Sequence, residues 1–241
     1  MKTIALIPAR YAATRFPAKL MQPLGGKSII RRTYENTVGT LLFDEVIVVT
    51  DSDIIFNEIV QTGGYAIMSK QPHESGSDRI AEAVADIDVD IVINVQGDEP
   101  FVKKELLENL LGAFKNDLHH KVEVASLMYR VVNEEIIENP NHVKVVVDMD
   151  NNALFFSRSV IPFHRDKNIT PVYYKHIGIY AYRKNILMNF TKWDTTPLEK
   201  LEKLEQLRYL ENGIKIKMIL TDESPISIDT PQDYELAKKL I

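Results

Sequence analysis

The 241-residue chain contains no cysteine. This absence excludes a disulfide framework, a thiolate zinc site and a cysteine nucleophile, and it fits a protein of the reducing cytoplasm. No apolar run reaches the roughly 20 residues that a membrane-spanning helix needs. The first apolar run, Thr3 to Pro8, is too short for a signal-peptide core and meets Arg10 instead of a cleavage site. We therefore expect a cytoplasmic protein with no membrane partner.

The chain also has fewer basic than acidic residues: it contains 29 Lys and Arg and 34 Asp and Glu, which gives a net charge of −5. A protein that grips a polyanion along its length is usually basic, so nucleic acid is not an expected partner. A small phosphorylated ligand needs only a local basic cluster. The chain also lacks the glycine spacing of a Walker loop or a dinucleotide fingerprint, which disfavours ATPases and dehydrogenases.

Short β-branched runs alternate with amphipathic helical stretches in the first half, which is the pattern of βαβ units. The pattern predicts an α/β fold with a mixed, mainly parallel sheet flanked by helices. The predicted strands are 2–8, 45–50 and 91–95, and the predicted helices are 28–38, 53–61 and 75–85.

The second half is less regular and predicts a hairpin, two strands and two helices. The hairpin would pair 142–148 with 153–158 around the turn residues 150–152. We expect strands at 176–183 and 215–221, one helix over 198–212 that ends at Gly213, and a last helix beginning at Pro231. We find no repeat or long linker, so we expect one domain over 1–241, with a small lobe around 150–185.

A basic loop, Pro8 to Lys19, follows the first strand and carries the cations Arg10, Arg15 and Lys19. In a doubly wound sheet ligands bind beyond the carboxyl ends of the strands, so this loop lies where a nucleotide phosphate would bind. By charge alone, a solvated basic loop explains it equally well.

Three further stretches have polar residues at the ends of predicted elements. In His73 to Arg79, a helix cap at Ser75 or Ser77 is the stronger interpretation, although Gly76 would let the backbone approach a ligand. Asn94 to Pro100 places Asp98 after a buried strand, where a carboxylate suits Mg²⁺. Asp229 precedes the last helix and would supply a second carboxylate for such a metal.

Together these stretches resemble the 3-deoxy-manno-octulosonate cytidylyltransferase (CMP-KDO synthetase) family, where KDO is 3-deoxy-manno-octulosonate. The similarity is colinear from end to end, and chance does not explain so many motifs in order. The residues that carry it are Ile7 to Tyr11 with Arg15 and Lys19, His73 to Arg79, Asn94 to Pro100, Phe156 to Arg158 with Ile161-Pro162, His176 to Tyr180, Leu204 to Arg208, and Asp229 to Pro231.

The resemblance implies a Rossmann-like nucleotide-diphospho-sugar transferase fold, a homodimer, Mg²⁺, and a role in the inner core of lipopolysaccharide. It implies transfer of CMP from CTP to the anomeric hydroxyl of an eight-carbon sugar acid. It assigns Arg15, Lys19 and Asp98 to catalysis and Asp98 and Asp229 to the metal. By the same resemblance, the nucleotide is bound by Pro8, Arg10, Arg15, Lys19, Ser75, Gly76 and Arg79, and the sugar by Gln96, Arg158, His176, Tyr180, Glu205 and Gln206.

Two segments depart from the family pattern. The chain has Pro17-Ala18-Lys19-Leu20 where the family usually has Pro-Gly-Lys-Pro, so the loop loses a glycine and a proline. The segment from His164 to Tyr174 is short, as in members that resemble enzymes using 8-amino-KDO. The alternatives are therefore 8-amino-KDO or another sugar acid as acceptor. A non-catalytic nucleotide-binding regulator is disfavoured because Lys19, Asp98 and Asp229 are all present.

Overall fold

The computed structural model describes residues 1–12, 16–71, 73, 75–222 and 226–241. The chain divides into two units. Unit 1 comprises Met1–Glu108, Arg183–Thr191 and Pro225–Ile241, and unit 2 comprises Asn109–Tyr182 and Lys192–Ser224. Residues 150–185 fall almost wholly within unit 2, and their role as a dimerisation lobe stays a prediction.

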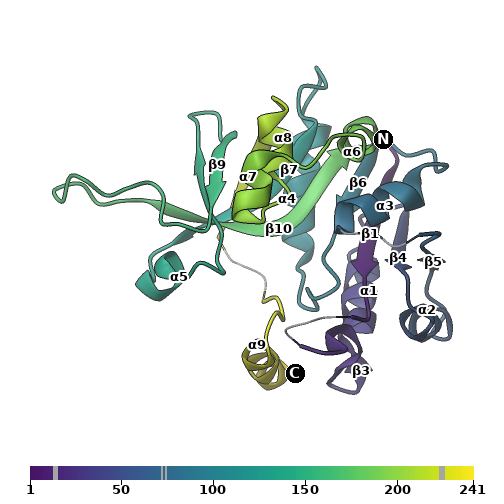
Figure 1. The fold of residues 1–241 in the computed structure, drawn as a ribbon. Coiled ribbons are helices and arrows are strands. Elements are labelled where there is room, and N and C mark those ends of the chain that lie inside the picture. The colour runs from purple at the N-terminus through teal and green to yellow at the C-terminus, as the bar shows by residue number, and fades with distance from the viewer. Residues whose placement is uncertain (13–15, 72, 74, 223–225) are drawn as a thin grey trace. The chain divides into compact units, whose positions relative to one another are not determined.

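Unit 1 is built on four parallel strands in the spatial order β6-β1-β4-β5 (Figure 1). They are β1 (Thr3–Ala9), β4 (Glu45–Thr50), β5 (Ala66–Met68) and β6 (Ile91–Asn94). Their apolar, β-branched side chains are buried on both sides, as parallel strands between two layers of helices require.

Three helices connect these strands: α1 (Ile29–Gly39), α2 (Asp53–Val60) and α3 (Gly76–Val84). The chain steps from β1 to β4 to β5 in one direction and then returns past β1 to β6. Because such crossovers are right-handed, α1 and α2 cover one face of the sheet and α3 covers the other. The reversal creates a switch point between β1 and β6, where open α/β sheets bind ligands at the carboxyl ends of their strands.

Smaller elements complete unit 1. The 3₁₀ turn η1 (Lys19–Met21) and the short hairpin of β2 (Pro23–Leu24) and β3 (Lys27–Ser28) lie between β1 and α1 in the sequence. Later come α6 (Lys184–Phe190), α9 (Pro231–Ala237) and η2 (Lys238–Leu240). The chain passes from unit 1 into unit 2 within α4 (Lys104–Lys115).

Unit 2 contains a mixed ladder of strands. β7 (Val124–Val131) pairs in parallel with β11 (Ile216–Thr221) and antiparallel with β10 (Tyr173–Arg183). β8 (Lys144–Val147) pairs antiparallel with both β10 and β9 (Ala153–Ser157). Three short helices accompany them: α5 (Glu134–Glu138), α7 (Pro197–Glu202) and α8 (Leu207–Glu211).

The predicted α/β class and most of the predicted elements are confirmed. The single helix predicted over 198–212 is wrong, because the structure has two helices separated by residues 203–206. Lys203 takes a left-handed backbone (φ 54°), which ends α7, and α8 begins only at Leu207. The amphipathic spacing continues through the break because Leu204 remains buried, so the pattern alone did not reveal it.

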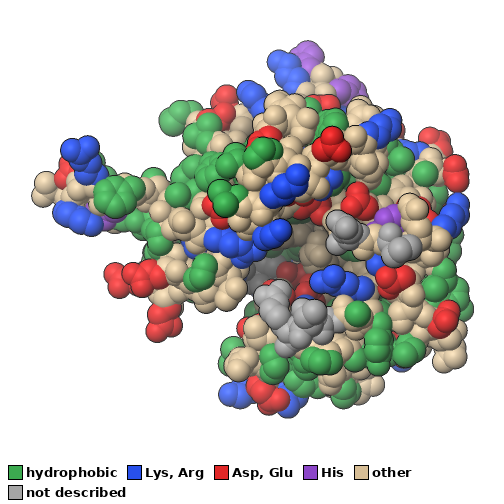
Figure 2. All heavy atoms as spheres, viewed as in Figure 1, with side chains coloured by type: hydrophobic (Ala, Val, Ile, Leu, Met, Phe, Trp, Pro, Cys, Tyr) green, Lys and Arg blue, Asp and Glu red, His purple; other side chains and the backbone are tan. Residues whose placement is uncertain are grey.

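A long arm without regular secondary structure connects β9 to β10 over residues 158–172. It contains the polar stretch from 163 to 171. Figure 2 shows the arm as a narrow projection that carries basic and hydrophobic side chains. Separately, none of the described helices has both the length and the apolar composition needed to cross a bilayer.

Candidate active site

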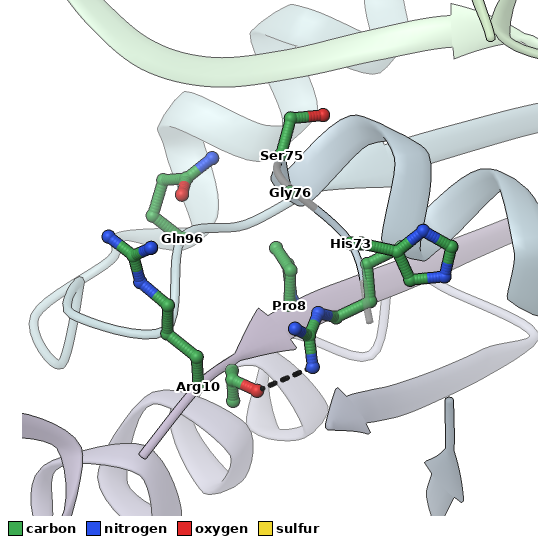
Figure 3. A pocket seen from close by; sticks show the side chains of 8 residues that line it. Pro8, Arg10, His73, Ser75, Gly76 and Gln96 are labelled. Atoms are coloured by element: carbon green, nitrogen blue, oxygen red, sulfur yellow. Dashed lines mark hydrogen bonds between the residues drawn. The ribbon is translucent and has the colours of Figure 1, made fainter. Parts of the chain in front are cut away.

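A cavity of about 200 Å³ opens at the switch point of unit 1 (Figure 3). The carboxyl end of β1, the amino end of α3 and the turn after β6 form its walls. In Figure 3, Arg10 and Gln96 lie on one side, Pro8 lies at the centre and His73 on the opposite side. The residues that line it are Pro8, Ala9, Arg10, His73, Ser75, Gly76, Arg79 and Gln96.

Arg79 connects two of these walls, the start of α3 and the carboxyl end of β1. Its guanidinium is buried and donates hydrogen bonds to the Ala9 carbonyl (3.3 Å, dashed in Figure 3) and to the Asp51 carboxylate (2.7 Å). The hydrogen bond from Arg79 holds the pKa of Asp51 below its ordinary value. Resemblance placed Arg79 at the nucleotide. In the structure it lines the cavity, and these bonds give it a framework role as well.

Ser75 is the N-cap of α3, as the structural interpretation of this stretch predicted. Its Oγ accepts a hydrogen bond from the Asp78 backbone N–H (3.1 Å) and donates one to the Asp78 carboxylate (2.8 Å). A Cβ added at Gly76 would lie 3.4 Å from Pro8 Cγ, so glycine keeps this wall of the cavity open. Ser75 can therefore cap α3 and, together with Gly76, line the cavity.

The turn after β6 packs closely around Gly97, so a larger residue there would require its neighbours to shift. A Cβ there would lie 3.1 Å from both the Pro8 carbonyl oxygen and Leu20 Cδ1. The Gly97 carbonyl accepts a hydrogen bond from the buried Thr33 hydroxyl (2.9 Å), which fixes the turn against α1. Gln96 therefore projects from a rigid turn. It lies on the same side of the cavity as Arg10, although the resemblance assigned it to the sugar.

Lys19, Asp98 and Asp229 come together in unit 1 although they are up to 210 residues apart. Lys19 Nζ lies 2.5 Å from Asp98 Oδ2 and 3.5 Å from Asp229 Oδ1. The Ile228 backbone N–H donates to the Asp98 carbonyl (3.0 Å), so the two acidic segments are also linked through the backbone. Two carboxylates that bracket a cation are a donor set suited to a hard metal ion.

The rest of the basic loop is described in part. Arg10 is exposed beside the cavity, whereas Arg15 lies outside the described residues. Ala18 has a left-handed backbone (φ 49°), the conformation that glycine adopts at least cost. The departure from the family's glycine therefore keeps the lysine in place at some cost in backbone strain.

Unit 2 brings together most of the residues that resemblance assigned to the sugar. His176 and Tyr180 lie on β10 with their rings 5.3 Å apart, and Phe156 packs edge-on to His176 at 5.1 Å. Burial lowers the pKa of His176 to about 3 and raises that of Tyr180, and Glu205 raises the pKa of Tyr180 further. Gln206 is a buried residue at the start of α8.

Arg158 makes more structural contacts than a substrate-binding role alone requires. Its guanidinium donates to the backbone carbonyls of Glu202 (2.8 Å), Pro140 (3.0 Å) and Lys203 (3.4 Å). Its backbone N–H donates to the Glu202 carboxylate at 3.0 Å. Arg158 thus ties β9 to the break between α7 and α8, and its contact with a sugar carboxylate stays a prediction.

Two residues of this arrangement were missed by the sequence reasoning. His73 lines the cavity and pairs with Glu82 on α3, yet its motif drew attention only to Ser75, Gly76 and Arg79. Lys144 is buried and donates to three carbonyls, including that of Arg158 (2.7 Å). Burial lowers the pKa of Lys144, and nothing in its strand-like sequence indicates such a site.

Comparison with known proteins identifies the family. A family model described as cytidylyltransferase matches residues 4–216. The 3-deoxy-manno-octulosonate cytidylyltransferase of Flavobacterium johnsoniae is 61% identical over 241 residues, covering 100% of this chain and 99% of that protein. The enzyme of the same name from Christiangramia forsetii is 54% identical over 240 residues, with coverage of 100% and 97%. The chain belongs to the 3-deoxy-manno-octulosonate cytidylyltransferase family.

Solved structures agree with this membership, which confirms the resemblance and the predicted fold. A CMP:2-keto-3-deoxy-manno-octonic acid synthetase in complex with CTP matches with a TM-score of 0.94 and 37% identity, over 100% of this chain and 98% of that one. The 4-diphosphocytidyl-2C-methyl-D-erythritol synthase of Anaerococcus prevotii has a TM-score of 0.64 at 17% identity, over 99% and 98% of the two chains. The second likeness shows the shared fold alone.

The buried neutral His176 predicts acid lability. Its pKa is about 3 in the folded protein and near 6.5 in an unfolded chain, so the unfolded chain binds the proton first as the pH falls. Stability is therefore lost from pH 6.5 downward until about pH 3, and the loss is ~2 kcal/mol at pH 5. Urea unfolding at pH 7.5 and pH 5 should show this loss in the wild type but not in His176→Gln. The exposed His119→Gln serves as control and should behave like the wild type; equal pH dependence in all three proteins contradicts the prediction.

Proposed function

We propose that this protein transfers CMP from CTP to the anomeric hydroxyl of KDO, giving CMP-KDO and pyrophosphate. The observation that carries the proposal is the Lys19–Asp98–Asp229 cluster in the same unit as a cavity at the switch point, in a chain of this family. The name of the 61% identical relative and the bound CTP of the solved relative support the choice of substrates. A cytoplasmic location and a role in lipopolysaccharide inner-core synthesis are part of the same proposal.

The cavity of unit 1 is proposed to receive the nucleotide. Pro8 and Ala9 line it, and the exposed guanidinium of Arg10 beside it suits a phosphate. Ser75 and Gly76 at the start of α3 supply a narrow, polar wall for the cytidine. Because Arg79 fixes β1 to the segment after β4, the cavity is formed before the nucleotide arrives.

The Lys19 cluster fits Mg²⁺. Asp98 and Asp229 are the residues that would hold the ion, and no group of three His, Asp or Glu occurs among the described residues to form a complete protein cage. Mg²⁺ commonly binds through one or two carboxylates together with phosphate oxygens, which matches this donor set. When bound, the ion would neutralise charge on the phosphates. The Lys19 ammonium lies within 3.5 Å of both carboxylates, which supports the proposal that a cation binds here.

In the proposed reaction, the anomeric oxygen forms a bond to the α-phosphorus while the bond from that phosphorus to the pyrophosphate oxygen breaks. Negative charge grows on the departing oxygens, and Lys19 is proposed to stabilise it. Arg15 is proposed to assist from the same loop. The hydroxyl proton passes to solvent or to a nearby carboxylate, so no dedicated base is required.

The sugar acid is proposed to bind through residues of unit 2, and for Gln96 of unit 1 a sugar contact is proposed from the family resemblance alone. His176, Tyr180, Gln206 and Glu205 offer hydrogen bonds to hydroxyls, and Arg158 offers a cation for the carboxylate. The short segment from His164 to Tyr174 keeps 8-amino-KDO as the alternative acceptor. The intact cation and carboxylate cluster disfavours a regulator that binds nucleotide without reacting.

Substrate choice is tested by pyrophosphate release with KDO and 8-amino-KDO, each combined with CTP, UTP, ATP or GTP. We expect CTP with KDO to react fastest, because the segment from Ser75 to Arg79 resembles a cytosine-facing element, and UTP to be a weak substitute, because uracil has the same ring size. Equal turnover with ATP refutes the proposal, and faster turnover of 8-amino-KDO selects the alternative sugar.

Lys19→Ala should lower kcat while the KM for sugar changes little, since the charge of Lys19 acts on the phosphates.

The metal assignment is tested with Mn²⁺ in place of Mg²⁺, followed by electron paramagnetic resonance in the presence of CTP. Asp98→Asn keeps the size of the side chain and removes its charge, so we expect weaker Mn²⁺ binding and roughly 100-fold lower turnover. Asp229→Asn should act in the same direction. The exposed Asp86→Asn, on unit 1 but outside the cluster, should match the wild type. Wild-type Mn²⁺ binding in both cluster variants would show that the ion binds elsewhere.

The homodimer is proposed to form through the arm of residues 158–172. Four hydrophobic side chains of this arm are exposed. Single exposed apolar residues are common, but a group of four on one segment favours an interface. They are Val160, Phe163, Ile169 and Val172, of which Phe163 is 85% exposed.

Phe163→Glu places a charge in the proposed interface and should shift the protein toward monomer. Sedimentation velocity across a range of protein concentrations measures this shift. Leu118→Glu is the matched control, because Leu118 is also 85% exposed but lies outside the arm. A wild type that stays monomeric at high concentration, or a dimer insensitive to Phe163→Glu, contradicts the assignment.

A further inference from the structure

Ser126 occupies a buried polar position at the centre of unit 2. It lies on β7 and has no exposed surface. Its Oγ is 3.0 Å from His176 Nε2, 3.1 Å from the Ile177 carbonyl oxygen and 2.9 Å from the Ile179 carbonyl oxygen. Three polar atoms of β10 therefore converge on one hydroxyl.

A break in strand pairing produces this convergence. The register between β10 and β7 shifts between Ile177 and Tyr180, so Ile177 is opposite Leu127 while Tyr180 is opposite Ser126. The two extra residues of β10 form a bulge, and bulges re-aim backbone groups and side chains. Here both carbonyls turn toward Ser126 Oγ, which compensates for the ladder hydrogen bonds that the bulge disrupts.

The single proton of the serine hydroxyl determines the state of the histidine. A carbonyl oxygen only accepts hydrogen bonds, so the Ser126 proton is needed for the Ile179 and Ile177 carbonyls. If Nε2 lacked a proton, Ser126 would have to donate to it, and bare oxygen lone pairs would face each other at 2.9–3.1 Å. With a proton on Nε2, the ring donates to Ser126 Oγ and Ser126 donates to the carbonyls, so each group has a suitable partner.

The surroundings of the ring keep it uncharged. His176 is packed between the rings of Phe156 and Tyr180, and its pKa is lowered to about 3 by burial and, to a lesser degree, by Lys175. Only one ring nitrogen is therefore protonated at neutral pH. If that nitrogen is Nε2, then Nδ1 is an acceptor.

We propose that Ser126 is a positioning residue that holds His176 in its Nε2–H tautomer, so that Nδ1 accepts a hydrogen bond from a hydroxyl of the sugar. The inference rests on the proposed function, because it assigns the chemistry of a residue proposed for sugar binding. It adds a residue outside the motifs that the sequence singled out, and it specifies the direction of the hydrogen bond.

The tautomer is measured directly by long-range nitrogen–proton correlation NMR of the protein labelled at histidine ring nitrogens, at pH 7.5. His176→Gln identifies the signals of His176 among the six histidines. We expect the Nε2 shift of a protonated nitrogen and the Nδ1 shift of a bare nitrogen. In Ser126→Ala, the acceptor for Nε2–H is lost and the Nδ1–H form should become populated. A wild-type ring protonated on Nδ1 overturns the inference without any variant.

Kinetics then ask whether the tautomer matters for the sugar. Ser126→Ala should raise the KM for KDO roughly fivefold to tenfold, as loss of one oriented hydrogen bond does, while the KM for CTP stays within about twofold. Ser126→Thr keeps the hydroxyl and should restore both the tautomer and the KM. Thr221→Val removes another buried hydroxyl, which donates to the Met128 carbonyl, and should leave the KM for KDO unchanged even where stability falls.

The outcomes separate this inference from the proposed function. If the wild type does not use KDO, or if His176→Gln leaves the KM for KDO unchanged, the proposed sugar site fails. If His176→Gln raises that KM but Ser126→Ala changes neither the KM nor the tautomer, the sugar site stands and the role of Ser126 is refuted.

Discussion

The buried guanidinium of Arg79 is the constraint on which the geometry of the cavity in unit 1 depends. One cation from α3 reaches the carbonyl at the end of β1 and the carboxylate of Asp51 just after β4. A buried charge without such partners is costly, so the arginine enforces the spacing of the elements around it. The result is a preformed cavity edge, in which the spacing between Pro8 on β1 and Gly76 at the start of α3 is fixed, although loops adjoin both elements.

The sequence predicted the fold of unit 1 well because its strands are buried on both faces and its helices are amphipathic, so local pattern and tertiary role agree. The resemblance assigned Lys19 to the phosphates and Asp98 and Asp229 to one metal ion, and the structure brings these three side chains together in unit 1. Arg158 illustrates a limit: its charge suggested a substrate, and the structure adds three carbonyl acceptors that no spacing rule indicates.

The features that sequence reasoning missed share a physical cause. In each, a buried polar side chain forms hydrogen bonds with backbone carbonyls that the fold brings to it. Lys144 reads as part of a strand, yet its ammonium supplies hydrogen bonds to the carbonyls of Asn139, His142 and Arg158. Ser126 reads as a small residue in an apolar strand, yet it completes the hydrogen bonding of a bulge in β10. Local propensity reveals neither, because the Arg158 carbonyl and the carbonyls of the β10 bulge reach these side chains only after the strands have paired.

The candidate sites of the two units differ in their polar chemistry. Unit 1 places an ammonium between carboxylates, an arrangement that responds to phosphate and metal charges and is screened by salt. Unit 2 surrounds His176 with aromatic rings and a serine, and the histidine stays neutral. A charged group attracts many anions, whereas a buried neutral acceptor discriminates, because a ligand without the matching hydroxyl leaves it unpaired. Under the proposed function, charge would bind the nucleotide phosphates, and neutral groups such as His176 would distinguish one sugar acid from similar ones.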